Sequence, residues 1–467
     1  MTHYIGKKGY TILKSSLTED VLNKTKSELW LKPQMPGKQF AQNQVQAFPV
    51  FRENDKKIYI PRFYGEEKFG APCRSELDDG LDINVEFTKE LRDYQYKIVD
   101  VYMNHVSKGS GGGILEVPCG RGKTVLSLYI ISLLKKKTMI LVHKEFLMNQ
   151  WIERIQEFIP QAKVGKIQAQ ICDVEDKDIV IGMIQTMYTK TYDQSVYSQF
   201  GLTIIDEVHR IGSEEFSKTL LKTITPYMLG ISATVERKDK LTSLLYMFIG
   251  PRIYSETRAT DDTVCVRALE FVTRDDDFNT VETDFRGQVK YSSMMSKLCS
   301  YGPRSDFIVK VIRDLIIENP DGQIMILAHY KNVLKYLHEK ITFMGFATVG
   351  YYIGGMKQKD LEISETKQIV IATYAMAAEA LDIKSLSRLV MATPKSDIIQ
   401  SVGRILRMKH ENPIVVDIID NHECFQNQWF NRKRFYKKSN YLIKKSSNDK
   451  YTSFDDDSWK IEFIPKK

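Results

Sequence analysis

The stretch that decides the fold is residues 114–124, which read Ile-Leu-Glu-Val-Pro-Cys-Gly-Arg-Gly-Lys-Thr. An apolar run leads into a glycine-rich turn, and apolar residues then recur at helical spacing as far as Leu134. A strand, a tight turn and a helix start in this order surround an anion with backbone N–H groups. Lys123 can reach the β- and γ-phosphates of a triphosphate, and the Thr124 hydroxyl can ligate Mg²⁺. The stretch therefore predicts a nucleoside-triphosphate site.

The turn departs from the strict phosphate-loop pattern G-x-x-x-x-G-K-[ST], because Val117 stands where its first glycine belongs. Gly120 and Gly122 still allow the close approach to phosphate that a side chain would block. Taken alone, the turn also fits an ordinary glycine-rich helix start that happens to carry a lysine.

Two carboxylates further along the chain favour the nucleotide interpretation. Asp206 and Glu207 directly follow the apolar run Leu202–Ile205, so they are expected at the carboxyl edge of a parallel sheet, where ligands bind. We expect Asp206 to hold Mg²⁺ through water and Glu207 to orient and activate the attacking water. An isolated Asp-Glu pair is more often a solvated loop, but its position after an apolar strand favours catalysis.

Short apolar runs alternate with amphipathic stretches twice along the chain, which predicts an α/β protein with two parallel sheets in tandem. The runs expected to be strands are 114–117, 139–142, 179–182, 202–205 and 228–231, then 324–328, 346–349, 369–372, 389–391 and 414–418. We expect a small, partly β accessory domain at 1–85 and a first α/β domain at 86–255. A linker or small insertion at 256–300 and a second α/β domain at 301–425 follow.

The tail 426–467 combines aromatic and basic residues between Trp429 and Lys445. Such a mixture is typical of surfaces that bind nucleic acid, because bases stack on rings and phosphates attract cations. An amphipathic helix that packs its aromatics on the second domain explains the composition equally well.

Composition bounds the remaining possibilities. The 467 residues carry a net charge of +8, a weak indication of a polyanionic partner. The six cysteines form no C-x-x-C pair, which argues against a zinc site and a disulfide framework. No apolar run approaches the length of a membrane span, and the N-terminus lacks the apolar stretch of a secretion signal. We therefore expect a soluble intracellular protein.

Further motifs give the chain a family resemblance. Asp206–His209, Ser232–Thr234 and Gln400–Arg407 follow one another in the order seen in superfamily 2 helicases. Leu91–Gln95, Ser232–Thr234 with Arg237–Asp239, and Ile371–Tyr374 indicate one branch of that superfamily. The chain resembles the xeroderma-pigmentosum-group-B and phage UvsW type, and looks closest to helicases of large DNA viruses, including the poxvirus transcript-release type. This resemblance, over roughly residues 86–440, implies two tandem RecA-like parallel-sheet domains with a small N-terminal α+β accessory domain.

The resemblance also implies a role for each motif residue. Nucleotide binding is expected from Arg92, Gln95, Gly120, Gly122, Lys123 and Thr124, with Mg²⁺ on Thr124 and Asp206. Catalysis is expected from Lys123, Asp206, Glu207, Gln400, Arg404 and Arg407, the two arginines reaching from the second domain to the γ-phosphate. Ser232, Thr234 and Asp382 are expected to couple hydrolysis to domain closure, and Lys144, Gln185, Thr186 and Thr373 to contact a nucleic-acid strand. Ala380 replaces the family's glycine, which bears on coupling more than on hydrolysis.

The expected function is that of a helicase or translocase driven by ATP and Mg²⁺, moving 3′ to 5′ on DNA. RNA or an RNA–DNA hybrid is the alternative substrate. The viral likeness implies a role in transcription, with RNA polymerase or transcription factors as partners, and repair or recombination is the other context. If the protein is viral, we expect it in the host-cell virus factory, with packaging in the virion as a further option. The sequence does not indicate an oligomeric state, and it is compatible with a monomer. The alternative function is a nucleic-acid-stimulated ATPase that remodels protein–DNA complexes without separating strands.

Overall fold

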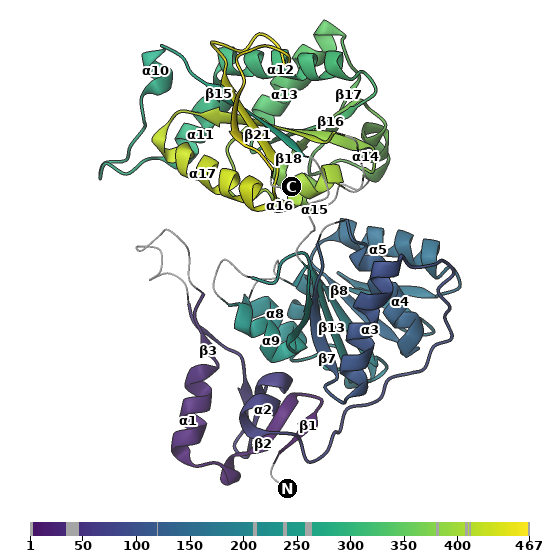
Figure 1. Ribbon diagram of the computed structural model, residues 1–467. Helices are drawn as coiled ribbons and strands as arrows, with labels where there is room; N and C mark the ends of the chain where they lie inside the picture. Colours follow the sequence, from purple (N-terminus) through teal and green to yellow (C-terminus); the bar gives the residue numbers. More distant parts are fainter. Residues whose placement is uncertain are drawn as a thin grey trace. The chain divides into compact units, whose positions relative to one another are not determined.

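The computed structural model describes residues 3–33, 46–118, 120–208, 213–236, 241–256, 264–379, 383–406, 410 and 412–465. The chain divides into two compact units, Met1–Thr257 (unit 1) and Arg258–Lys467 (unit 2) (Figure 1). Each unit contains one large sheet with helices on both faces. No helix among the described residues is long and apolar enough to cross a membrane.

The sheet of unit 1 has eight strands in the order β10-β9-β11-β8-β12-β13-β7-β14, and only the pair β10–β9 is antiparallel. Its strands are β7 (Gly112–Glu116), β8 (Thr138–Val142), β9 (Val164–Gln168), β10 (Ile171–Cys172), β11 (Ile179–Met183), β12 (Leu202–Asp206), β13 (Tyr227–Ser232) and β14 (Arg252–Ser255). Its helices are α3 (Asp93–Ser107), α4 (Lys123–Leu134), α5 (Glu145–Phe158), α6 (Ile184–Thr189), α7 (Gln194–Ser198), α8 (Ser213–Leu220) and α9 (Thr242–Ile249).

Two apolar cores sandwich this sheet. Helices α3, α4 and α5 pack on one face, and α6, α8 and α9 on the other. Because both faces are covered, the central strands are continuous apolar runs instead of alternating ones. All five residues of β8 and of β12 are buried. This burial explains why the strands were recognisable from the sequence.

The N-terminal segment forms its own small antiparallel sheet in the order β1-β2-β6-β5. Its elements are β1 (His3–Gly6), β2 (Gly9–Leu13), α1 (Glu19–Glu28), β3 (Trp30–Leu31), β4 (Phe48–Pro49), β5 (Arg52–Glu53), β6 (Lys57–Ile60) and α2 (Arg62–Phe69). The Arg62 guanidinium donates hydrogen bonds to the carbonyls of Ser110 and Pro226 in the large sheet's loops. The small sheet is thereby fixed to the rest of unit 1.

The sheet of unit 2 also has eight strands, in the order β17-β18-β16-β19-β20-β15-β21-β22, parallel except for the edge strand β22. Its strands are β15 (Cys265–Phe271), β16 (Gln323–Ala328), β17 (Val349–Tyr352), β18 (Ile369–Thr373), β19 (Leu386–Met391), β20 (Ile414–Asp420), β21 (Leu442–Ser447) and β22 (Lys460–Phe463). Its helices are α10 (Asp276–Asn279), α11 (Tyr291–Ser300), α12 (Gly302–Glu318), α13 (Lys331–Met344), α14 (Gln358–Glu365), α15 (Tyr374–Glu379), α16 (Ile399–Gly403) and α17 (Glu423–Lys438). Helices α12 and α13 cover one face of the sheet, while α15, α16 and α17 lie on the other (Figure 1).

Two segments differ from the sequence-based expectation. The segment 256–300, expected to be a linker or insertion, supplies β15, which pairs with β20 and β21 inside the sheet. The tail 426–467, expected to be a separate basic and aromatic segment, supplies β21, β22 and most of α17. Helix α17 buries Trp429 and Tyr436, as the alternative of an amphipathic helix packed on the second domain expects. Charged residues hid these strands, but Arg267 pairs with Glu318 at 2.7 Å and Lys445 with Glu270 at 2.9 Å. Paired charges of this kind are tolerated in half-buried strands.

Candidate nucleotide and nucleic-acid site

The phosphate loop connects β7 to α4 and makes two left-handed turns. Gly120 and Gly122 have φ angles of 82° and 79°, which residues with a side chain rarely adopt. Space is short as well, because a Cβ on Gly122 would lie 2.5 Å from Nε2 of Gln95. Gly122 is the N-cap of α4, so the helix dipole points at the loop. Both glycines are therefore required by conformation.

Val117, which stands where the phosphate-loop pattern has its first glycine, is fully buried in the core that α3, α4 and α5 form on one face of the sheet. Its N–H donates to the carbonyl of Ser232 at 2.8 Å. The residue thus extends the strand and does not belong to the phosphate-binding turn, which explains why an apolar side chain stands there.

Lys123 and Glu207 lie together at the end of the loop. Lys123 Nζ is 3.2 Å from Oε1 of Glu207, and the two side chains are 14% and 19% exposed. Glu207 has a φ angle of 49°, and its N–H donates to the carbonyl of Ile231 at 3.0 Å. A γ-phosphate would compete with the Glu207 carboxylate for the lysine, which would release the carboxylate toward water.

Asp206 is the last residue of β12 and is only 8% exposed. Trp151 Nε1 on α5 donates a hydrogen bond of 3.0 Å to Oδ2. Burial and the neighbouring Glu207 raise the pKa of Asp206 to about 6. A buried carboxylate whose direction is fixed by an indole fits a divalent cation, whose charge would favour the ionised form.

The Ser232–Thr234 loop contacts the same group. Ser232 Oγ lies 3.3 Å from Oε2 of Glu207 and donates to the carbonyl of Thr234 at 2.6 Å. The Thr234 N–H donates back to Ser232 Oγ at 3.3 Å. The structure therefore brings the expected coupling serine to the expected catalytic glutamate.

Glu116 is a residue of this site that the sequence analysis missed. Its Oε1 accepts a hydrogen bond from the Val235 N–H at 3.0 Å. Its Oε2 accepts from Arg252 Nη1 at 2.9 Å and from Ser255 Oγ at 2.7 Å. One carboxylate thus joins the start of the phosphate loop, the loop after Thr234 and strand β14. The sequence feature that could have identified Glu116 is its position as an acidic residue at the end of an apolar strand.

Gln95 lies behind the phosphate loop and is 5% exposed. Its Oε1 accepts from the Arg92 N–H at 2.9 Å, and its Nε2 donates to the Arg121 carbonyl at 3.0 Å. These two bonds use one lone pair and one hydrogen of the amide. Arg92 itself is exposed, and its Nη1 is 3.4 Å from the Tyr94 hydroxyl.

Arg121, inside the loop, is held from two sides. Its guanidinium lies 4.4 Å over the Tyr94 ring and forms an ion pair with Glu256. The nucleotide loop is therefore tied to α3 and to the residue that follows β14.

Three of the expected strand-contact residues lie in unit 1. Lys144 is the N-cap of α5. Gln185 Nε2 donates a hydrogen bond of 3.0 Å to the carbonyl of His143, the residue before Lys144. These two positions are brought together. Thr186 is 8% exposed, and its hydroxyl accepts the Ala169 N–H at 3.0 Å. Its hydroxyl is therefore engaged in holding the loop.

The remaining expected residues belong to unit 2. Thr373 ends β18 and accepts the Met376 N–H at 3.4 Å. Gln400 lies on α16, and Arg404 opens the following 3-10 turn, Arg404–Leu406. Arg407 and Asp382 lie outside the described residues. The α-helix that carries Gln400 ends at Gly403.

A cluster near Thr373 was not foreseen. His329 Nδ1 is 2.9 Å from Oγ1 of Thr393, and the Tyr374 hydroxyl donates to the Thr393 carbonyl at 2.7 Å. Lys395 Nζ lies 4.4 Å over the Tyr374 ring. Burial, aided by the charge of Lys395, lowers the pKa of His329 to about 4. A neutral histidine thus lies at the carboxyl edge of the second sheet.

Comparison with known proteins agrees with this geometry. Residues 88–237 match the family described as "Type III restriction enzyme, res subunit". A protein of Acanthamoeba polyphaga mimivirus, named as an ATP-dependent RNA helicase, is 33% identical over 457 residues, which are 94% of this chain and 85% of the relative. A protein of invertebrate iridescent virus 6 named as a helicase is 25% identical over 92% of this chain and 98% of its own. The DNA 3′-5′ translocase XPB2 of Sulfurisphaera tokodaii is 32% identical over 170 residues, 36% of each chain.

Solved structures support the fold. Dbp5 of S. cerevisiae, bound to RNA and ADP BeF3, superposes with a TM-score of 0.52 at 12% identity, covering 76% of this chain and 90% of its own. Two sheets of mainly parallel strands, each covered by helices, are consistent with tandem RecA-like domains. The chain belongs to the superfamily 2 helicases, in the branch found in large DNA viruses, and is an ATP-dependent enzyme of that family.

Proposed function

We propose that this helicase hydrolyses ATP with Mg²⁺ and uses the cycle to move 3′ to 5′ along DNA. The observation that carries the proposal is the convergence of Lys123, Asp206 and Glu207 on the phosphate loop, with Ser232 beside Glu207. An ammonium, a metal-binding carboxylate and a water-activating carboxylate are the groups that phosphoryl transfer to water requires.

Each group has a chemical task in this scheme. Lys123 leaves Glu207 for the β- and γ-phosphates, and Glu207 orients the attacking water and accepts its proton. Thr124 and Asp206 would hold Mg²⁺, which would supply positive charge to the phosphate oxygens. Gln95 uses its remaining donor and acceptor to read adenine, next to Arg92. Gln400, Arg404 and Arg407 contribute positive charge and hydrogen bonds from unit 2.

The protein moves along the strand when contacts to the nucleic acid from unit 1 and from unit 2 form and break in turn. Lys144 and Gln185 in unit 1 and Thr373 in unit 2 contact the phosphate backbone, which carries no sequence information. Thr186 keeps the Gln185 segment in place through its bond to Ala169. Ser232 and Thr234, together with Asp382, transmit the state of the nucleotide to these contacts.

The choice of DNA rests on the translocase relative, and the name of the mimivirus relative makes RNA the competing substrate. Because the similar viral chains come from large DNA viruses, we propose a role in transcription, releasing the transcript or remodelling DNA beside RNA polymerase.

Four parallel ATPase assays test the proposal: no nucleic acid, single-stranded DNA, duplex DNA and RNA. We expect stimulation by single-stranded DNA, and loss of hydrolysis in Lys123→Ala. Stimulation by RNA alone would overturn the DNA assignment, and no stimulation by any polynucleotide would overturn the motor. Duplexes with 3′ or 5′ tails then give the polarity. Hydrolysis without strand displacement would favour remodelling of protein–DNA complexes instead.

A further inference from the structure

Helix α17 is held to the second sheet by one face. Arg432, 2% exposed, donates from Nε and Nη2 to the two carboxylate oxygens of Asp417 at 2.8 and 2.9 Å. The Tyr436 hydroxyl donates to the same carboxylate at 2.9 Å. Phe425 and Trp429 are buried on this face too. A buried, doubly hydrogen-bonded ion pair fixes the rotation of the helix about its axis.

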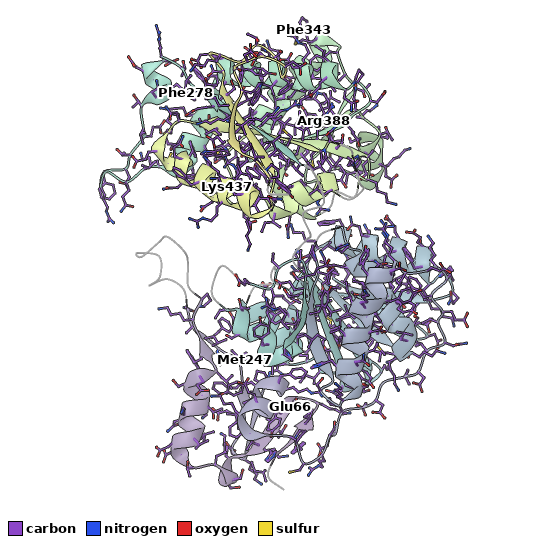
Figure 2. The ribbon with its side chains drawn as sticks, viewed as in Figure 1. Glu66, Met247, Phe278, Phe343, Arg388 and Lys437 are labelled. Atoms are coloured by element: carbon purple, nitrogen blue, oxygen red, sulfur yellow. The ribbon has the colours of Figure 1, made fainter. Side chains whose placement is uncertain are left out.

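The opposite face of α17 is consequently fixed toward solvent. We define the α17 surface as the exposed side chains beyond the first turn of the helix: Asn427, Phe430, Asn431, Arg434, Lys437 and Lys438. These positions repeat every three or four residues and share one side of the helix. They comprise three cations, two amides and a phenylalanine that is 60% exposed, whereas the only acid of the helix is Glu423 at its first position. Figure 2 labels Lys437 on this helix.

The cations of the α17 surface differ from other lysines in the tail. Lys433 pairs with Glu462, and Lys445 with Glu270. Arg434 and Lys438, by contrast, form no ion pair with any residue in the described part of the chain. Their charge is therefore not neutralised within the described fold.

The buried face of α17 is connected to a residue next to Thr373, which is expected to contact the strand. Arg432 Nη1 donates to the carbonyl of Lys395 at 2.8 Å. Lys395 covers the ring of Tyr374, which follows Thr373 at the end of β18. Helix α17 and the helix that follows Thr373, α15, therefore lie on the same face of the second sheet (Figure 1).

We propose that the α17 surface binds single-stranded nucleic acid beyond the contact at Thr373. Arg434, Lys437 and Lys438 contact phosphates, and Phe430 stacks on a base. An exposed ring beside Arg434 and Lys438, whose charges are not neutralised within the described fold, matches the way strands are bound without sequence readout. The two amides can hydrogen-bond to phosphate or sugar oxygens. This inference rests on the proposed function, since it extends the same strand path.

Truncating the tail is not a clean test, because residues 442–447 form a strand inside the sheet. Point substitutions at exposed positions avoid this problem. We suggest Arg434→Ala with Lys438→Ala, and separately Phe430→Ala. The matched control is Lys335→Ala with Lys340→Ala on α13, which removes the same charge from the opposite face of the sheet.

The readout is binding of a fluorescent oligothymidylate to the full chain over a series of salt concentrations. Removing two phosphate contacts should lower the slope of log affinity against log salt by about 1.4 relative to the control. Phe430→Ala should weaken binding on the order of ten-fold, with little change in slope. Thermal unfolding and ATP hydrolysis without nucleic acid should match the unsubstituted protein.

Slopes and affinities equal to those of the control would overturn the inference and leave the proposed function intact, and would point to a protein partner for the surface. Failure of the unsubstituted chain to bind or be stimulated by any strand would overturn the proposed function itself. The two failures are therefore distinguishable.

Discussion

The indole N–H of Trp151 donates a hydrogen bond of 3.0 Å to Oδ2 of Asp206, and both side chains are buried. Trp151 lies on α5, the helix whose N-cap is Lys144. One rigid helix therefore joins a proposed strand contact to the proposed metal carboxylate, and the indole fixes the direction in which that carboxylate points.

Trp151→Phe should weaken Mg²⁺ binding, because the Asp206 carboxylate loses the donor that orients it. Loss of such a supporting contact typically costs about 10- to 100-fold in metal affinity. Mn²⁺ binding in the presence of ADP, followed by electron paramagnetic resonance, measures the effect apart from turnover. Trp459→Phe, which alters a tryptophan in unit 2, is the control, and equal affinities in both variants would refute the prediction.

Stability of the metal-free protein should depend on Asp206 between about pH 4 and pH 6. The folded state raises the pKa of this carboxyl from 3.8 to about 6, so it binds the proton more tightly than the unfolded chain does. Stability therefore falls as pH rises through this window. Asp206→Asn should be more stable than the unsubstituted protein at pH 7, by at most about 3 kcal/mol, and equally stable near pH 4. Thermal unfolding at both pH values, without Mg²⁺, checks this.

Glu207→Gln should separate binding from hydrolysis. The amide keeps the size of the side chain but cannot accept a proton from water, so the hydrolysis rate should fall on the order of 10²-fold or more. Loss of the ion pair with Lys123 should leave nucleotide affinity unchanged or improved. A rapid-quench measurement of hydrolysis, together with fluorescent-nucleotide binding, tests both statements. Full activity would remove Glu207 from the catalytic group.

Gln95→Glu should impair ATP binding more than the small change in side-chain size suggests. A carboxylate oxygen would then face the Arg121 carbonyl, which now accepts a hydrogen bond from Nε2 at 3.0 Å. Repulsion at this point would displace the loop that carries Gly122, so we expect KM for ATP to rise by about ten-fold or more. Gln95→Ala removes the donor without the repulsion. A larger defect in the alanine variant would contradict this explanation.

Glu116→Ala should loosen the connection between the phosphate loop and β14. It would leave the Val235 N–H without its acceptor and Arg252 without its counter-ion, at a cost of about 1–3 kcal/mol in unfolding free energy. Glu116→Gln retains an acceptor for the N–H and is the control. Because β14 leads out of unit 1, the alanine variant should also lose stimulation by nucleic acid before it loses basal hydrolysis. Steady-state ATPase assays with and without single-stranded DNA measure that ratio.

Much of the fold was predictable because both large sheets are buried on both faces. Strands such as β12 and β16 are mainly apolar and buried along their whole length, and the glycine-rich turn marked the first crossover. The predictions failed where strands carried charge. In β15 and β21, Arg267 and Lys445 find partners in Glu318 and Glu270, and such pairing across distant segments cannot be read from local composition.

The sequence by itself determined the chemistry of this protein. The phosphate loop, Asp206–Glu207, Ser232–Thr234 and Gln400–Arg407 follow one another in the order of an ATP-dependent helicase, and the comparisons with known proteins confirm that family. Only the tertiary structure decided how those residues are supported. Trp151 supports Asp206, Glu116 supports the loop after Thr234, and Arg432 supports Lys395. None of the three supporting residues belongs to a recognisable motif, and each lies far in sequence from the residue that it supports. Their roles depend on hydrogen bonds that exist only after the sheets bring distant segments together.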